Sequence, residues 1–517
     1  MAQAPTAAPP QAFTPMTGSA LWIAGGLMAL ANFMAVLDTT IANVSVPNIA
    51  GGLAVSPSQG TWVITSYAVA EAITVPLTGW LAQRFGTVRV FVAAMLGFGL
   101  FSAMCGLAPS LSALVVCRIL QGLAGGPMMP LSQTLMRRVF PERLQPAAMG
   151  LWGMTTVVGP IAGPLLGGYL CDAAGWPWVF YINVPIAAVA AFFAWRMLKP
   201  AETQTRRVPV DFVGLGLLVL WIGAMQYMLD KGKDLDWFQS PLIVALAITA
   251  AVGFVAFVLW ELTEEHPVVD LRVFRHVGFS ASTIIMCLTF GCFFSSVVLI
   301  PLWLQTSLGY TAQWAGRVTA FQGVLAVVMS PIVARLITKV DARILVSFGV
   351  LCLGAVSFWR TGFESDVSFW HLAAPQIAQG FAMPFFFLPL NVLAMRAVKP
   401  QETASAAGLL NFTRTTAGAF ATSLTTTAWE NLASGRHSDL AGTLNAPQSM
   451  LDQLQRAGLS ASQALGQLDA LVQGQSVMLA TNRVFTVLSV VFVLAAACVW
   501  LAPKPKRRMG AGAAGGH

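Results

Sequence analysis

The chain has 517 residues, of which 56% are hydrophobic and only 10% are Asp, Glu, Lys or Arg. Soluble globular proteins carry about 25% charged residues, so this composition excludes a soluble fold and indicates that the solvent is lipid. The net charge of +8 raises the question of a nucleic-acid partner. No Lys/Arg-rich helix with interleaved aromatic residues occurs, however, and the cations lie between apolar runs, which argues against nucleic acid.

The chain begins with an Ala/Pro-rich segment, residues 1–18, that contains no Lys or Arg. It lacks the charged region of a cleaved signal peptide, so we expect a cytoplasmic N-terminal tail and a first span that is retained. Runs of about 20 apolar residues, enough to cross ~30 Å of hydrocarbon as a helix, follow along the whole chain. They predict fourteen spans, at 19–43, 59–81, 88–107, 111–134, 147–170, 177–197, 211–230, 240–260, 280–303, 315–338, 344–360, 369–395, 405–428 and 484–502.

The basic residues provide a test of this topology. With the N-terminus in the cytoplasm, 20 of the 29 Lys and Arg fall on the cytoplasmic side and six fall outside. Such a division follows the positive-inside rule, and one missed span would invert every later loop. We therefore expect a multi-pass protein of the bacterial inner membrane with both ends in the cytoplasm, including a short basic tail at 503–517.

The sequence also repeats itself at an offset of 258 residues. Residues 121–124 (QGLA) match 379–382 (QGFA), and 148–151 (AMGL) match 406–409 (AAGL) in the same order. Ordered matches indicate a duplicated unit. We predict an all-α polytopic membrane protein of two six-helix bundles, at 19–200 and 266–502, with two inserted spans at 201–265.

One long polar segment, 429–483, interrupts the second bundle, and the topology puts it on the periplasmic side. The segment is rich in Gln, Ser, Ala and Leu, and 445–475 fits an amphipathic hairpin. Two interpretations stay open: a solvated loop, or a docking surface for a periplasmic partner.

Two motifs rich in glycine indicate close approach or bending of the backbone. In 79–86 (GWLAQRFG) we expect Gly79 to close the helix end, Gly86 to form a tight turn, and Arg84 to hold the loop on the cytoplasmic side. In 159–168 (GPIAGPLLGG) glycines four residues apart share one helix face, while each proline bends the helix. The residues concerned are Gly159, Pro160, Gly163, Pro164, Gly167 and Gly168.

Ionisable residues inside apolar spans are costly and are therefore candidates for function. Of the 21 Asp and Glu, only Asp38 and Glu71 lie well inside the predicted spans, and none of the five His does. Proton carriage then falls to these carboxylates; the alternatives are an interfacial helix-end acid for Asp38 and helix packing for Glu71. Arg118 either tunes a nearby proton carrier or caps backbone carbonyls, and Arg414 is a cavity cation or a partner of one acid.

Enzymatic and ATP-driven functions lack their motifs in this chain. No G-x-x-x-x-G-K-[ST] phosphate loop, H-E-x-x-H motif or intramembrane nucleophile dyad occurs. The seven Cys lie in or beside apolar segments without a C-x-x-C spacing, and we interpret them as small hydrophobic residues. We expect no enzyme activity, no cofactor and no metal.

Four strings resemble one family: 37–47 (LDTTIANVSVP), 59–67 (QGTWVITSY), 178–185 (WVFYINVP) and 411–415 (NFTRT). They are similar to strings of the fourteen-helix drug:proton antiporters of the major facilitator superfamily, and 159–168 resembles the antiporter motif of its exporters. The motif at 79–86 departs from the family pattern, which has an acid where this chain has Gln83. The resemblance implies proton-coupled multidrug efflux, with a periplasmic adaptor and an outer-membrane channel as partners. A proton-coupled transporter of a lipid, fatty acid or siderophore is the alternative.

A transporter of this type needs a substrate pocket near the bilayer midplane. Polar, aromatic and Met side chains in the spans are candidates to line it, although simple packing is the alternative for each aromatic or Met residue. The candidates are Asn43, Trp62, Tyr67, Gln121, Trp152, Met154, Asn411 and Phe412.

Overall fold

The computed structural model describes residues 16–55, 57–60, 62–206, 209–232, 235–310, 312–364, 367–443 and 447–501. Over these ranges the regular structure is helical, without a β-strand, as the sequence predicts. The first half contains α1 (Gly18–Gly52), α2 (Pro57–Gly60), α3 (Trp62–Thr74), α4 (Thr78–Phe85), α5 (Thr87–Gly106), α6 (Leu111–Gly125), α7 (Met128–Val139), α8 (Gln145–Ala174), α9 (Trp178–Tyr181) and α10 (Asn183–Leu198). The basic tail at 503–517 and most of the N-terminal tail lie outside the described residues.

Two helices, α11 (Phe212–Lys231) and α12 (Pro241–Thr263), connect the halves. The second half contains α13 (Val277–Ser307), α14 (Ala312–Leu336), α15 (Ala342–Trp359), α16 (Phe369–Arg396), α17 (Thr403–Thr443), α18 (Pro447–Arg456) and α19 (Ala461–Cys498). Short 3-10 turns join several of these, among them η4 (Arg360–Gly362) and η5 (Pro400–Glu402).

Eleven helical stretches among the described residues are long and apolar enough to cross a membrane. The other three predicted spans, 59–81, 147–170 and 405–428, coincide with α3 and α4, with α8, and with the first part of α17. The helical membrane architecture is confirmed, while the count of fourteen stays a prediction.

Proline and glycine break two of the predicted spans into pairs of helices. Pro76 lies between α3 and α4, and Pro127 lies between α6 and α7. Proline has no backbone N–H to continue the helical ladder, and its ring crowds the preceding turn. The α-helix of the second span is therefore interrupted by a turn at 75–77, and that of the fourth span by a turn at 126–127.

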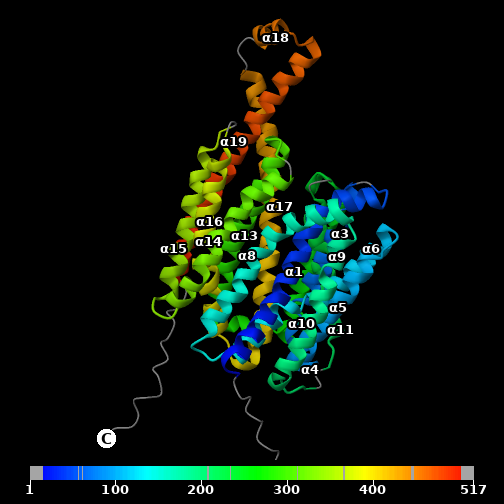
Figure 1. The fold of residues 1–517 in the computed structure, drawn as a ribbon, viewed down its shortest axis with the longest axis vertical. Coiled ribbons are helices and arrows are strands. Elements are labelled where there is room, and N and C mark those ends of the chain that lie inside the picture. The colour runs from blue at the N-terminus through cyan, green and yellow to red at the C-terminus, as the bar shows by residue number, and fades with distance from the viewer. Residues whose placement is uncertain are drawn as a thin grey trace, which may run out of the picture.

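The two halves touch mainly where α8 packs on α14 and α16, and where α4 and α7 pack on α17. Figure 1 shows α8 and α17 between the two sets of helices. The contact of α4 with α17 is close, because a Cβ added to Gly79 would lie 2.9 Å from the Cα of Ser405, and one added to Gly408 would lie 2.9 Å from the Val75 carbonyl oxygen. We call the end where α1 begins and α19 ends the tail end, and these contacts lie toward it.

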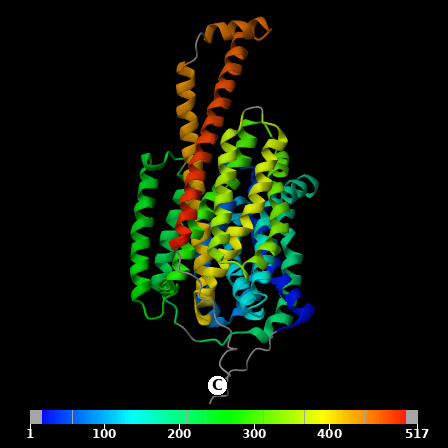
Figure 2. The same ribbon diagram turned by 90° about the vertical axis from the view of Figure 1, so that its left-hand side faces the viewer.

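The inserted helices α11 and α12 pack on each other, and α11 also contacts α3 and α17. In Figure 2 they stand at one side of the bundle, in green. The outer face of α12 is apolar and exposed, with Ile248 at 59%, Val252 at 63% and Val255 at 56%. An apolar face of this kind is stable against lipid, so the insertion widens the bundle in the membrane plane.

A helical hairpin projects from the opposite end, which we call the hairpin end (Figures 1 and 2). It consists of the outer parts of α17 and α19 with α18 at its tip. The helix predicted to end at 428 therefore continues to Thr443, and the helix predicted to begin at 484 already begins at Ala461. At 1.5 Å per residue the 41 residues of α17 measure about 60 Å, roughly twice the hydrocarbon thickness. The described part of 429–483 is therefore a helical extension and not an irregular loop, and the choice between a solvated segment and a docking surface stays a prediction.

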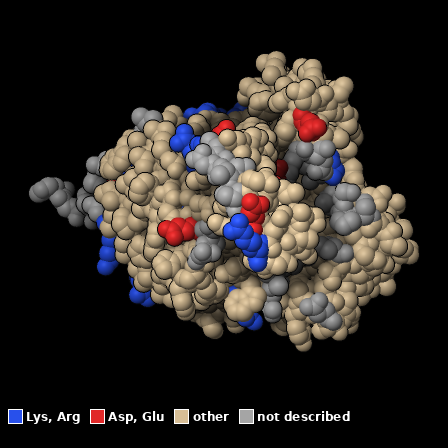
Figure 3. Space-filling model, turned by 90° about the horizontal axis from the view of Figure 1, so that it is seen from above, with Lys and Arg blue, Asp and Glu red and all other residues tan. Residues whose placement is uncertain are grey.

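Contacts between α17 and α19 hold the hairpin together. Trp429 Nε1 donates to Thr481 Oγ1 at 2.8 Å near its base, and His437 Nε2 lies 3.0 Å from Asp469 Oδ1 farther out. Ser460 and Gln463 form a capping box at the start of α19. Seen from this end, the surface is mainly uncharged, with isolated acidic and basic side chains (Figure 3).

Candidate functional site

A buried ion pair joins α1 and α6 inside the first half. Arg118 Nη1 lies 2.6 Å from Asp38 Oδ2, and both side chains are 1% exposed. Gln121 Nε2 donates to the other oxygen, Oδ1, at 3.0 Å, and Asn183 Nδ2 donates to the same atom at 2.7 Å. Donors from α6 and α10 therefore surround one carboxylate from α1.

The Arg118 guanidinium has further partners on every side. Its Nε donates to the Val63 carbonyl oxygen at 2.9 Å, and its Nη1 also donates to Gln121 Oε1 at 2.8 Å. Its Cζ lies 4.3 Å from the ring centre of Tyr67 and 5.5 Å from that of Phe180, within cation–π range. The cluster thus fixes α1, α3, α6 and the start of α10 relative to one another.

The local sequence explains how α6 supplies two of these groups. Arg118 and Gln121 are three residues apart and so share one helix face. Gly122 lets that face approach α3, since a Cβ there would lie 2.6 Å from the Tyr67 carbonyl oxygen. Asn183 is the first residue of α10. A search for charged residues in the spans does not find it, because its amide is uncharged and only its contact with Asp38 marks it.

Glu71 lies on α3 in a different setting from Asp38. Its side chain is half-buried, and within the described ranges its carboxylate makes no hydrogen bond or ion pair. Its backbone is closely covered by α6, because a Cβ on Gly126 would lie 3.1 Å from the Glu71 carbonyl oxygen. Glu71 is therefore fixed in position while its carboxylate stays available.

Arg414, on α17, is buried without an acidic partner in the part of the chain that the structure describes. The residue is 2% exposed, and its Cζ lies 5.2 Å from the ring centre of Phe290, 5.4 Å from that of Phe387 and 6.0 Å from that of Trp152. Its Nη2 lies 3.8 Å from Met129 Sδ, and its Nε has no hydrogen-bond partner. The aromatic rings stabilise the guanidinium by cation–π contacts. Its Nε–H, however, has no hydrogen-bond partner at this boundary between the two halves.

The predicted pocket residues of the first half do not share one environment. Tyr67 and Gln121 belong to the ion-pair cluster described above and are 1% and 0% exposed. Asn43 is exposed, and Trp62 is half-buried. In this conformation Gln121 therefore orients Asp38 and does not line an open cavity.

The remaining candidates lie where the halves meet. Trp152 is fully buried and stacks on Phe387, with ring centres 6.2 Å apart, while Asn411 Nδ2 donates to Gln133 Oε1 at 3.0 Å. Phe412 packs edge-on against an aromatic ring of α11. Met154 is half-buried and lines a cleft at the tail end. The structure thus brings Trp152 next to Arg414 but keeps Met154 apart.

The glycines of the fifth span face α1. A Cβ added at any of three positions would meet α1 side chains or backbone, and these positions are Gly159, Gly163 and Gly167. Gly168 lies outside this four-residue series, and a Cβ added there would meet nothing within 4 Å. The side chains of Pro160 and Pro164 lie outside the described residues.

The loop motif is organised by an acid that the sequence analysis missed. Gly86 has φ +96°, a conformation that favours glycine, and leads into α5. Glu202, just after α10, accepts hydrogen bonds from the backbone N–H groups of Val88 and Arg89, each at 3.0 Å. Arg84 stacks its guanidinium over Trp80, with Cζ 5.4 Å from the ring centre. Glu202 thus brings a carboxylate to a loop whose own sequence has Gln83 in place of an acid.

The second half contains a related cluster in which Ser296 and Gln379 lie 258 residues after Asp38 and Gln121, while Gln376 stands at the position of Arg118. Gln379 Nε2 donates to Ser296 Oγ at 3.1 Å, as Gln121 donates to Asp38 in the first half. The cation there is Arg360, which is 1% exposed and donates to Gln379 and Gln376. Arg360 is one of the six cations counted on the outer side in the sequence analysis, and the structure shows that its side chain is buried in protein. Serine replaces the carboxylate, so this cluster holds a cation without a buried acid.

Comparisons with known proteins agree with this architecture. A family model described as Major Facilitator Superfamily matches residues 28–422. The multidrug export protein EmrB of Escherichia coli (strain K12) is 42% identical over 508 residues, covering 97% of this chain and 99% of that protein. The fatty acid resistance protein FarB of Neisseria gonorrhoeae is 42% identical over 505 residues, with the same shares. The human organic anion transporter MFSD10 has the same fold, with TM-score 0.59 at 15% identity over 93% of this chain and 99% of its own.

Proposed function

Because the chain belongs to the major facilitator superfamily, a family of transporters, and is similar to EmrB exporters along its whole length, we propose that it is a proton-coupled multidrug efflux antiporter. It exchanges protons for hydrophobic or amphipathic compounds across the inner membrane. The observation that carries the proposal is the buried ion pair of Asp38 and Arg118.

Charge balance links this pair to a proton. A buried ion pair is neutral as a unit, but separating its members leaves two uncompensated charges in a medium of low dielectric constant. When α1 and α6 move relative to each other during alternating access, protonation of Asp38 removes one of those charges. Glu71, whose carboxylate has no partner among the described residues, is the second carrier, and Arg118 and Arg414 supply the compensating cations.

Exchange can be measured in inverted vesicles with an imposed pH gradient. Addition of a hydrophobic drug should collapse the gradient through the wild-type protein, and Asp38→Asn should abolish that collapse. Asp469→Asn, in the projecting hairpin and with a side chain 71% exposed, is the matched control and should exchange at the wild-type rate. An Asp38→Asn protein that exchanges drug for protons at full rate would rule out the proposed role of Asp38.

A second candidate is export of an anionic amphiphile such as a fatty acid. Arg414 supports it, because its unmatched Nε lies in an aromatic and Met-lined setting between the halves. The similarity to FarB favours the same class. Under this hypothesis Arg414→Gln lowers exchange of a fatty acid while leaving exchange of an uncharged drug unchanged, and equal losses for both compounds would contradict it.

The projecting hairpin is the proposed docking surface for a periplasmic adaptor, which leads to an outer-membrane channel. This assignment places the hairpin end in the periplasm and both chain termini in the cytoplasm. The outer part of α19 exposes apolar side chains, including Leu465 at 56% and Leu471 at 57%, beyond the bundle. Exposed apolar side chains on a projecting helical hairpin suit a helical partner.

The docking role can be tested by shortening the hairpin at the level where α17 and α19 contact each other. His437 and Asp469 are in contact across it, so a short linker can replace 438–468 without moving the base. The shortened protein should keep drug–proton exchange in vesicles but lose resistance in whole cells. Full resistance of the cells would exclude docking through the hairpin.

A further inference from the structure

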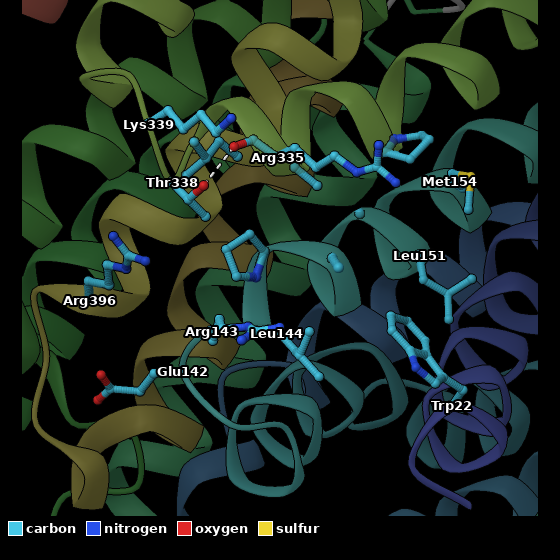
Figure 4. Close-up of a pocket in the computed structure, with 16 residues that line it drawn as sticks. Trp22, Glu142, Arg143, Leu144, Leu151, Met154, Arg335, Thr338, Lys339 and Arg396 are labelled. Carbon is cyan, nitrogen blue, oxygen red and sulfur yellow. Dashed lines mark hydrogen bonds between the residues drawn. The ribbon is translucent and has the colours of Figure 1, made fainter. Parts of the chain in front are cut away.

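A cleft of about 910 Å³ opens at the tail end between the two halves (Figure 4). The first half contributes α8, the loop before it and Trp22 of α1, while the second half contributes the end of α14, the turn after it and Arg396 at the end of α16. The cleft therefore lies across the boundary along which the halves must move. It lies apart from the Asp38 cluster, since none of that cluster's residues lines it.

The polar side of the cleft is strongly basic. Four cations line it against one carboxylate, that of Glu142, and these cations are Arg143, Arg335, Lys339 and Arg396. All four side chains belong to exposed residues, and none has an ion pair among the described residues. Like charges that converge from both halves repel each other, so an anion bound among them lowers the energy of this arrangement.

The other side of the cleft is apolar. Figure 4 shows Met154, Leu151 and Trp22 on the side away from Arg396 and Glu142. Trp22 is 44% exposed and lies in the first turns of α1, near the beginning of the first span. Tryptophan at the end of a span is typical of the membrane–water interface. The cleft thus has a cationic side and an apolar side, with Arg335 extending between them toward Met154, and Trp22 marks it as a site near the membrane–water interface.

We propose that this cleft binds an anionic glycerophospholipid, with the phosphate among the cations and an acyl chain along Leu151, Met154 and Trp22. A small inorganic anion matches only the cationic part, whereas a phospholipid fills both parts. Basic pockets between membrane helices are known to hold anionic headgroups. Bound there, the lipid connects the halves and stabilises the conformation in which they meet at the tail end.

Lipid retention by the purified full-length protein tests this inference without any transport measurement. Phosphatidylglycerol and phosphatidylcholine are titrated onto delipidated protein, and bound lipid is counted by native mass spectrometry. The wild type should retain phosphatidylglycerol in preference to phosphatidylcholine. Equal retention of the two lipids would overturn the proposal, whatever the protein exports.

A pair of double variants locates the site. Arg335→Gln with Lys339→Gln removes two cations of the cleft, and Arg196→Gln with Lys199→Gln removes two exposed cations at the same end on and just after α10. Each cation near an anionic headgroup contributes a factor of about five in affinity, so the cleft variant should bind phosphatidylglycerol about thirty-fold more weakly. The control should bind as the wild type does. Equal weakening in both variants would show a diffuse surface effect and contradict the cleft.

A competition experiment distinguishes a phospholipid from free phosphate as the anion that the cleft binds. Excess inorganic phosphate should leave phosphatidylglycerol bound, because the apolar wall holds the acyl chain. Full displacement by phosphate would identify the cleft as a site for small anions and refute its assignment to lipid. Purified protein of both double variants is first checked for a single peak in size-exclusion chromatography, so that a loss of binding reports on the site.

Discussion

Separating Asp38 from Arg118 by mutation should be costly, and removing both charges should cost much less than the two single changes together. The carboxylate accepts from three side chains and the pair is 1% exposed. Asp38→Asn leaves the guanidinium buried without a counter-charge, which costs about 3–5 kcal/mol of unfolding free energy. Arg118→Met, which keeps the length of the side chain, should cost a similar amount because it leaves the carboxylate unpaired.

The double variant removes the uncompensated charge altogether. Replacing a buried ion pair by neutral groups of similar volume is often close to neutral for stability. The double-mutant cycle should therefore give a coupling energy of on the order of 3 kcal/mol between these positions. Unfolding free energies are measured by titrating sodium dodecyl sulfate into mixed micelles.

An exposed pair provides the control for this cycle. Arg436 and Asp439 lie 3.9 Å apart in the hairpin with side chains 53% and 72% exposed, and Arg436→Met with Asp439→Asn should show no measurable coupling. If the effects of Asp38→Asn and Arg118→Met simply add, the two charges do not stabilise each other, and the charge-balance argument for proton coupling fails with them.

Three further changes test the surroundings of the site. Glu202→Gln weakens the cap on the first turn of α5 by about 1 kcal/mol, so hydrogen exchange should become faster there and stay unchanged at the far end of α5. Burial opposes ionisation of Glu402, but the hydrogen bond from His276 and the neighbouring cations outweigh it and hold the pKa of Glu402 below its usual 4.5. That stabilisation is complete above about pH 4.5 and is lost as the pH falls through the lowered pKa, so the melting temperature of the wild type should fall there more than that of Glu402→Gln. Ser296→Asp places a carboxylate beside the Gln379 amide, which Arg360 also contacts, so the new charge near Arg360 should raise the melting temperature. Ser296→Asp combined with Arg360→Met leaves that carboxylate without the cation and should lower the melting temperature.

Two features could be predicted from the sequence: the location of the helices, from composition, and the buried charged residues, from the cost of a charge in lipid. Apolar run length located the helices, and the expense of burying Asp38 and Arg118 marked both before their contact was known. Their pairing could not be predicted, because 80 residues separate them and nothing local in either helix encodes the crossing. Asn183 lies in the string 178–185, but as an uncharged amide it carried no sign of a contact with Asp38.

Span boundaries failed where a helix continues beyond the membrane. The outer part of α17 loses its apolar character near Trp429, so a hydropathy pattern ends there although the helical hydrogen bonds do not. Glu202 was missed for a related reason, since it lies outside every apolar run and acts on a loop more than 110 residues earlier. The burial of Arg360 was not predicted, because it is the last residue of a predicted span, where a buried and an exposed cation have the same sequence pattern.

The two halves of the duplicated fold differ in the charge of their buried clusters. Both halves place a glutamine on the same helix face and a cation beside it, but only the first half supplies an acid, Asp38, where the second has Ser296. Under the proposed function, a proton bound at Asp38 would change the charge of the first cluster, whereas the second cluster has no carboxylate to receive one. If transport is driven by protonation of a buried cluster, the first half is the one that responds, and the second half provides a fixed frame against which it moves. Converting Ser296 to Asp would then make the halves alike in charge and weaken the asymmetry on which coupling depends.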